Sequence, residues 1–192
     1  MSPKIVFLFL FFCSTALFAQ KKAKSTTSTP KLVVGIVVDQ MRYDYLYKYY
    51  DKLSDKGFKR LLREGFSFDN CQYDYMPTYT GPGHATIFTG TTPSVHGIIS
   101  NDWYVRDSAK IMYCATDTRM KTIGANTSAG QKSPHQLLAT TIGDELRLSN
   151  NFQSKVIGVA LKDRSAVFPA GRGGNAAYWY DAANGAFVTS SY

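Results

Sequence analysis

The chain has 192 residues and a formal net charge of +8 at neutral pH, a length that allows one domain of ordinary size. Five of these eight charges come from the lysines before Leu32, and no acidic residue precedes Asp39, so the remainder has a net charge of only +3. Because the charge lies in the leader, the high isoelectric point gives no reason to expect nucleic acid as a specific partner.

The first residues have the pattern of an export signal. Lys4 precedes an apolar run from Ile5 to about Phe12, and small and polar residues follow as far as Ala19. This predicts a secretory signal peptide over residues 1–19, a periplasmic or secreted protein and no membrane anchor, since the run is short for a membrane span. Residues 20–31 are basic and rich in serine and threonine, which is typical of a disordered linker.

A continuous run of β-branched residues, Leu32–Val38, predicts a strand buried on both faces of a sheet that helices cover. Asp39 follows it directly. Ligands of open α/β sheets bind at the carboxyl ends of strands, but an aspartate there also caps a following helix, so both interpretations remain open. Residues 54–65 predict a short amphipathic helix that ends at Gly65, and residues 66–75 alternate like a strand.

The stretch TYTGPGHATIFTG, residues 78–90, places Thr80 at the start of a predicted helix that stops at a glycine. A helix N-terminus attracts anions through free N–H groups and partial positive charge. A hydroxyl beside such a site suggests a nucleophile. The alternative is that Thr80 only caps the helix.

The second half of the chain predicts a further helix, a strand and a hairpin. Ser133 is the expected N-cap and Pro134 the first residue of a helix whose apolar stripe is formed by Leu137, Leu138, Ile142 and Leu146. Residues 154–161 predict a second buried strand, and residues 176–192 a hairpin around Asn184-Gly185. This alternation of strands and helices indicates an α/β fold.

Four polar residues besides Thr80 are expected at the sheet edge where α/β folds bind ligands: Asp39, Asn101, Lys162 and Arg164. A metal ion held by Asp39 would lower the pKa of the Thr80 hydroxyl, so that it ionises near neutral pH. Lysine, arginine and asparagine would then neutralise the other oxygens of a phosphoryl group. The alternative is that Asn101 and the Lys-Asp-Arg triplet are exposed turn residues.

Two cysteines, Cys71 and Cys114, remain after the leader, so the exported chain has either one disulfide or two free thiols. Because no Cys-x-x-Cys pair is present, a thiolate zinc site is not expected.

Three blocks together resemble the PafA-type alkaline phosphatases of the alkaline phosphatase superfamily: GIVVDQMR from residue 35, PTYTGPGHATIFTGTTPSVHGIISNDWY from residue 77, and GVALKDRSAVFPAG from residue 158. The resemblance runs from about Leu32 to the end. It implies an α/β/α sandwich with a central, mostly parallel sheet, incomplete in this chain. It also implies hydrolysis of phosphate monoesters.

The resemblance further implies a role for each matching residue. Thr80 would be the nucleophile that forms a phosphothreonine, and Asp39 and Thr80 would bind one of two zinc ions. Asn101, Lys162 and Arg164 would bind the substrate phosphate, and the Lys-Arg pair marks monoesterases. The three histidines, at positions 84, 96 and 135, receive no metal role and are expected to be structural.

The chain departs from the family pattern at the metal site. It contains neither Asp-x-x-x-His nor Asp-His, which the family's two-zinc site requires. We therefore expect the remaining ligands beyond Tyr192, residues 32–192 to be the N-terminal part of a catalytic domain, and the chain by itself to be a poor phosphatase or none.

Three alternatives to a phosphate monoesterase differ from it in sequence or in chemistry. A phosphodiesterase or nucleotide pyrophosphatase of the same superfamily would share the threonine nucleophile. A sulfatase would need a C/S-x-P-x-R motif, and none occurs. A phosphate-binding piece without chemistry is the non-enzymatic alternative.

Overall fold

The computed structural model describes residues 30–192. The predicted signal peptide and all but the last two residues of the predicted linker lie outside this range. The chain divides into two units, one ending at Met41 and the other comprising Arg42–Tyr192. Among the described residues, no helix has both the length and the apolar character that a membrane crossing requires.

Residues 30–41 form no helix or strand, so the strand expected at Leu32–Val38 is wrong in this structure. Its side chains are exposed rather than buried, with Val33 and Ile36 both 79% accessible. The composition suits a buried strand, but a strand forms only where a second strand completes its ladder. Within the described residues, none pairs with this run.

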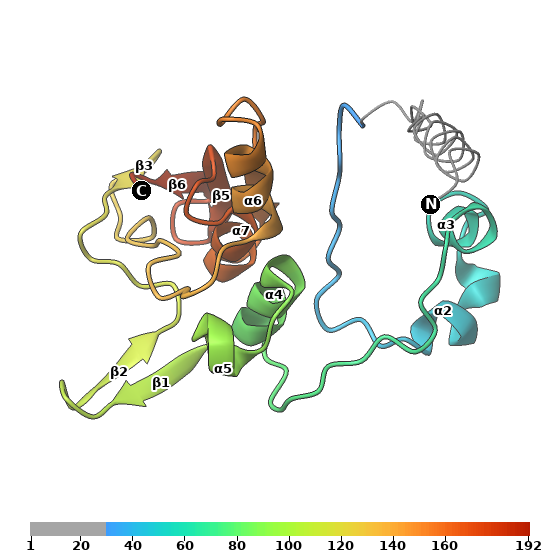
Figure 1. Cartoon of the computed structure of the whole chain (residues 1–192), viewed down its shortest axis with the longest axis horizontal. Coiled ribbons are helices and arrows are strands. Elements are labelled where there is room, and N and C mark those ends of the chain that lie inside the picture. Colours follow the sequence, from blue (N-terminus) through green and yellow to red (C-terminus); the bar gives the residue numbers. More distant parts are fainter. Residues whose placement is uncertain (1–29) are drawn as a thin grey trace, which may run out of the picture. The chain divides into compact units, whose positions relative to one another are not determined.

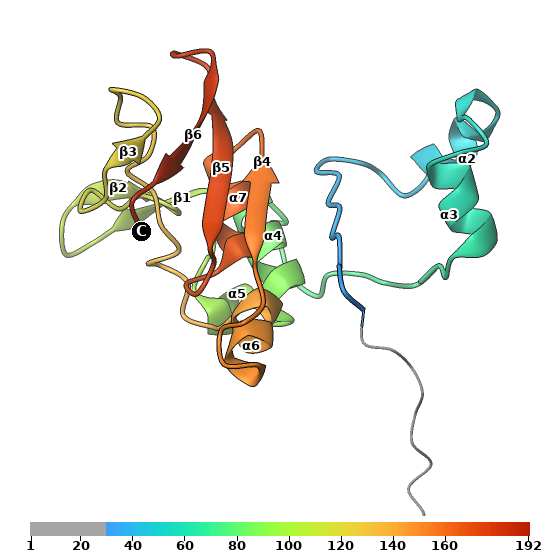
Figure 2. The same ribbon diagram turned by 90° about the horizontal axis from the view of Figure 1, so that it is seen from above.

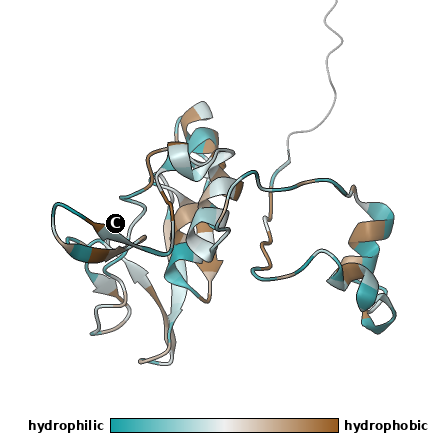
Figure 3. Ribbon diagram, turned by 90° about the horizontal axis from the view of Figure 1, so that it is seen from below, coloured by the Kyte–Doolittle hydropathy of each residue, from teal (hydrophilic) through white to brown (hydrophobic). Residues whose placement is uncertain are grey.

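The segment from Arg42 to Tyr79 has short helices: α2 Tyr45–Lys48, the 3₁₀ helix η1 Tyr50–Lys52 and α3 Phe58–Glu64 (Figure 1). Helix α3 is the predicted one, and it ends at Gly65, whose N–H donates to the Leu61 carbonyl. Figure 3 shows hydrophilic and hydrophobic residues on both α2 and α3. The strand predicted over residues 66–75 is wrong, because this stretch forms turns and irregular backbone.

Four helices belong to the rest of the chain: α4 Thr80–Thr89, α5 Pro93–His96, α6 Ile142–Ser149 and α7 Asp163–Ala170. Helix α4 starts and stops as predicted, and Gly90 ends it in the left-handed conformation with φ of 67°. Helix α6 starts later than predicted, because Thr141 and Asp144 form a reciprocal capping box. Ser133 instead bonds to Asp117, in a turn before the helix.

The four-stranded sheet has the order β3-β6-β5-β4 (Figure 2). Its strands are β3 Thr122–Ile123, β4 Ile157–Ala160, β5 Ala176–Asp181 and β6 Ala186–Ser190. β4 and β5 are parallel, and the other pairs are antiparallel. The predicted α/β class is confirmed, the described sheet is mixed, and β5 and β6 form the predicted hairpin. A separate antiparallel pair joins β1 Asp102–Val105 to β2 Lys110–Tyr113.

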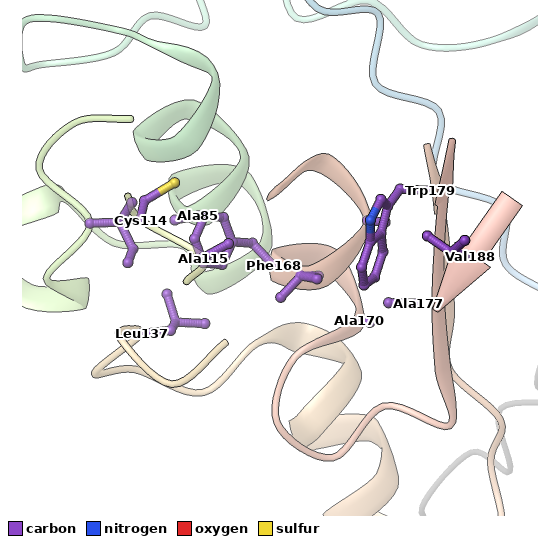
Figure 4. Packing of buried hydrophobic residues seen from close by; sticks show 12 residues of the cluster. Ala85, Cys114, Ala115, Leu137, Phe168, Ala170, Ala177, Trp179 and Val188 are labelled. Atoms are coloured by element: carbon purple, nitrogen blue, oxygen red, sulfur yellow. The ribbon is translucent and has the colours of Figure 1, made fainter. Parts of the chain in front are cut away.

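Helix α7 packs against β4 and β5, and α4 packs against α7, so the two helices form successive layers over the sheet (Figure 2). The core between the helices and the sheet contains Phe168, Trp179 and Val188, and none of these side chains is more than 3% exposed (Figure 4). A Cβ on Gly158 would lie only 2.1 Å from the Ala166 carbonyl oxygen, so glycine is required where α7 crosses β4. β4 itself is not buried as predicted, since Val159 is 65% exposed.

Candidate active site

Thr80 is the first residue of α4, as the sequence predicted. Tyr79 before it has extended backbone and accepts the first helical hydrogen bond, from the Gly83 N–H. The Thr80 carbonyl lies 2.8 Å from Nδ1 of His84, which donates to it. Because His84 is buried and bonded to the first turn, it fixes the backbone that carries the Thr80 hydroxyl.

Asn101 meets the same helix end. Its Oδ1 accepts from the Gly81 N–H at 2.7 Å, and Pro82 has no N–H, so this terminus has fewer open donors than the sequence suggested. The Asn101 amide NH₂ remains as a donor for an anion. A Cβ on Gly81 would lie 3.1 Å from that Oδ1 and 3.2 Å from the Cys114 sulfur, so the close approach depends on glycine.

Arg164 is held by Tyr113. Its Nη1 donates to the Tyr113 hydroxyl at 3.0 Å, and that hydroxyl donates to Asp163 Oδ1. The Arg164 backbone N–H also donates to Asp163 Oδ1, at 2.7 Å. Nε of Arg164 is buried and has no hydrogen-bond partner within the described part of the chain. The first turn of α7 therefore carries a fixed guanidinium with donor capacity left over.

The charged side chains around Asp163 leave a net positive charge at the start of α7. Lys132 Nζ lies 3.7 Å from Asp163 Oδ2 and 4.8 Å from the Tyr113 ring centroid. Because Lys132 offsets the carboxylate, Arg164 and the exposed Lys162 remain as uncompensated cations at the start of α7. Burial and the neighbouring Asp163 also raise the pKa of Tyr113 above its ordinary value, which keeps its hydroxyl protonated.

Cys114 connects these two groups of residues. It follows Tyr113 in the chain, its N–H donates to the Asn101 carbonyl at 2.8 Å, and its sulfur faces Gly81. Burial raises the pKa of its thiol to about 12, so it is not a reactive thiolate. Cys71 is exposed, and both cysteines are free thiols in this structure.

The structure thus joins three predicted residues, Thr80, Asn101 and Arg164, through one continuous set of contacts. Lys162 stands two residues before Arg164, at the N-cap of α7. Asp39 belongs to the first unit of the chain and the other four to the second.

His96 is completely buried, with both ring nitrogens bonded. Nδ1 accepts from the Ile98 N–H at 3.1 Å, so Nε2 carries the proton and donates to Thr86 Oγ1 at 3.0 Å. Burial lowers the pKa of His96. This neutral, satisfied ring agrees with the predicted structural role.

Sequence reasoning did not single out Tyr113, Asp163 or Lys132. Asp163 was visible only as the acid between two cations. Tyr113 and Lys132 carry no local signal, because their contacts with α7 cross a wide gap in the sequence.

Within residues 30–192, metal-binding side chains are scattered rather than gathered in one place. Among residues 30–192, no three or more His, Cys, Asp or Glu side chains lie close enough together to hold an ion. Asp39 and Thr80 offer carboxylate and hydroxyl oxygens, which suit zinc in kind but fall short of the three protein ligands that a catalytic zinc needs.

The family model described as type I phosphodiesterase / nucleotide pyrophosphatase matches residues 33–185, and the chain belongs to this family. Over the whole chain it is 48% identical to alkaline phosphatase PafA of Elizabethkingia meningoseptica, of which it covers 35%. It is 52% identical over 94% of its length to a protein named calcium-transporting ATPase in Myroides odoratus, of which it covers 32%.

A crystal structure of wild-type PafA matches 86% of this chain and 32% of that chain, with a TM-score of 0.84 and 51% identity. A PafA variant with one threonine, one asparagine, one lysine and one arginine replaced matches equally well, with a TM-score of 0.84. These findings confirm the resemblance to PafA-type alkaline phosphatases. The chain spans about a third of the length of the curated relatives it matches.

Proposed function

We propose that the protein is an exported, zinc-dependent phosphomonoesterase that acts through a phosphothreonine at Thr80. The observation that carries the proposal is the connected arrangement of Thr80, Asn101 and the anchored Arg164. The similarity to PafA supports it. The four residue types replaced together in the PafA variant are those of Thr80, Asn101, Lys162 and Arg164.

The proposed reaction has two steps. The Thr80 oxygen attacks phosphorus, the bond from phosphorus to the ester oxygen breaks, and the alcohol leaves with a proton. Water then attacks the phosphothreonine and releases inorganic phosphate, which restores the Thr80 hydroxyl. Asn101, Lys162 and Arg164 donate to the non-reacting oxygens, where hydrogen bonds strengthen as negative charge builds up.

Asp39 and Thr80 would hold zinc, with the remaining ligands outside this chain. A bound zinc would supply charge that lowers the pKa of the threonine hydroxyl and so favours attack near neutral pH. Export to the periplasm or the medium is proposed from the sequence of residues 1–19.

The nucleophile is tested by trapping. The product of the complete reading frame is incubated with p-nitrophenyl phosphate, quenched in acid and digested, and the phosphorylated peptide is identified by mass spectrometry. We expect the phosphoryl group on Thr80. Finding it on any other residue would overturn the assignment, and Thr80→Ala should remove the adduct while lowering kcat on the order of 10⁴-fold or more.

A phosphodiesterase is the second candidate, because the matching family model carries that description. A monoester has one more negative charge than a diester, so its transition state depends more on Lys162 and Arg164. Replacing both by alanine should lower kcat/KM for p-nitrophenyl phosphate on the order of 10²-fold more than for bis-p-nitrophenyl phosphate. An equal loss would favour the diesterase.

The 192-residue chain by itself tests the metal assignment. With Asp39 and Thr80 as its zinc ligands, we expect less than one zinc per chain and negligible p-nitrophenyl phosphate turnover. Two zinc ions per chain with rapid turnover would contradict this. Phosphate binding that Thr80→Ala leaves unchanged would favour a non-catalytic phosphate-binding role.

A further inference from the structure

The Tyr113 hydroxyl has its orientation set by both of its partners. A carboxylate accepts hydrogen bonds and a guanidinium only donates them. The phenolic hydrogen therefore points to Asp163, and a lone pair on the oxygen receives Arg164 Nη1 at 3.0 Å. Because neither partner can reverse its role, the hydroxyl acts as a fixed acceptor for one particular nitrogen of the arginine.

Which nitrogen it takes decides how Arg164 can bind an anion. A guanidinium offers two edges with paired N–H donors, one formed by Nη1 and Nη2 and the other by Nε and Nη2. Tyr113 occupies Nη1, which leaves the second edge for two parallel bonds to an oxyanion. Nε on that edge is buried and has no partner within residues 30–192.

Buried donors are normally satisfied, so an open Nε points to a ligand that completes it. The surroundings suit a phosphoryl oxygen, because Lys132 offsets Asp163 and leaves the arginine charge available. The raised pKa of Tyr113 keeps the hydroxyl protonated in alkaline solution, so the anchor persists there.

We propose that Tyr113 is a positioning residue, oriented by Asp163, that holds Arg164 so that its Nε–Nη2 edge receives the phosphoryl group. This rests on the proposed function for its substrate. The anchoring itself is a property of the protein without substrate.

The test is Tyr113→Phe in the product of the complete reading frame, which removes one oxygen and keeps the ring. We expect kcat/KM for p-nitrophenyl phosphate to fall on the order of 10-fold or more, and that for bis-p-nitrophenyl phosphate to change far less. The dissociation constant of inorganic phosphate, measured by calorimetry, should rise by a similar factor. Tyr104→Phe is the matched control, since Tyr104 is 60% exposed on the neighbouring strand, and it should leave all three values unchanged.

A double-mutant cycle separates positioning from general destabilisation. In an Arg164→Ala background, Tyr113→Phe should cause no further loss, because nothing remains to be positioned. If Tyr113→Phe lowers activity by the same factor with and without Arg164, the residue acts structurally and the inference is wrong. If Arg164→Ala lowers activity and Tyr113→Phe does not, the inference fails while the proposed function stands.

A measurement that needs no substrate tests the anchoring of Arg164 independently of the proposed phosphatase function. The Hε–Nε signal of Arg164, followed by NMR in arginine-labelled protein, should exchange slowly with water in the wild type and be lost in Tyr113→Phe. An unchanged signal in the variant overturns the anchoring whatever the activity. Absence of phosphatase activity with the signal behaving as expected would overturn the proposed function and leave the anchor.

Discussion

Residues 30–79 and residues 80–192 both contain apolar runs, but only those of the second region contribute to a buried core. No residue from 30 to 79 is buried, whereas every core residue lies beyond Thr80. Leu32–Val38 and Ile157–Ala160 are both rich in β-branched residues, yet only the second forms a strand, β4, because β5 pairs with it. Strand formation thus follows the partner rather than the composition of the run.

The largest difference between the two regions is expected at their phenylalanines. Phe168 is completely buried in α7, and Phe66 is 83% exposed. Phe168→Ala should lower the free energy of unfolding by about 3–5 kcal/mol, because it leaves a cavity in the core. Phe66→Ala should change it by no more than about 0.5 kcal/mol. Urea denaturation at equal m-values measures both, and comparable losses would mean that the first segment has a core of its own.

Two glycines of α4 differ in how closely the rest of the protein packs against them. A Cβ at Gly81 would meet three atoms at 3.1–3.2 Å, among them Asn101 Oδ1, whereas the nearest atom to one at Gly83 is Tyr73 Oη at 3.9 Å. Gly81→Ala should cost about 1–3 kcal/mol by overpacking. Gly83→Ala should stabilise by about 0.5–1 kcal/mol through helix propensity.

Thermal unfolding of the two variants gives the sign directly. If both alanine variants are more stable than the wild type, the Asn101 side chain moves aside at little cost and does not fix the helix end. Since Gly81→Ala also pushes Asn101 away from the Thr80 turn, it should lower phosphatase activity more than its loss of stability explains.

The sequence predicted the elements whose signals are local. Gly65 and Gly90 end α3 and α4, and Asn184-Gly185 forms the turn between β5 and β6, with Gly185 at φ of 72°. Each depends on a glycine stop or turn within a few residues, which a single sequence displays. Thr80 was placed at the helix start for the same reason.

Elements that depend on distant partners could not be predicted in this way. Ser133 and Pro134 look like a helix start, but Ser133 bonds to Asp117, and Thr141 takes the capping role. Tyr113 meets Arg164 only because β2 ends beside α7, and no periodicity in either segment encodes that contact. The sequence therefore named Thr80, Asn101, Lys162 and Arg164 as candidate phosphate-site residues, which stays a prediction, but it gave no sign of the residues that contact Arg164.

The pH dependence of stability provides a smaller effect. His96 is buried and neutral, and its pKa is lowered, so the unfolded chain binds its proton more readily than the folded one. The contribution of His96 to the free energy of unfolding should be fully present above the ordinary histidine pKa of about 6.5 and should fall as the pH drops through that value. His96→Gln should be less stable at neutral pH but should show a flatter profile between about pH 7 and pH 5.

The carboxylate Asp117 does not confuse this measurement. Its hydrogen bonds to Arg119 hold its pKa well below the usual range, so its contribution is lost only in more acid solution. Unfolding free energies of wild type and variant at several pH values isolate the histidine term. Parallel profiles would show that another group titrates there.

The smallest effect belongs to the ion pairs. Arg60 and Glu64 pair at 2.9 Å on the exposed surface of α3, where water screens the charges. Arg60→Ala should leave the urea midpoint unchanged. Lys132→Ala should lower it measurably, because Asp163, whose side chain is only 14% exposed, loses its offsetting charge beside Tyr113. Equal midpoints for the two variants would mean that Asp163 is hydrated as freely as Glu64, and the balance of charge proposed around Arg164 would then not hold.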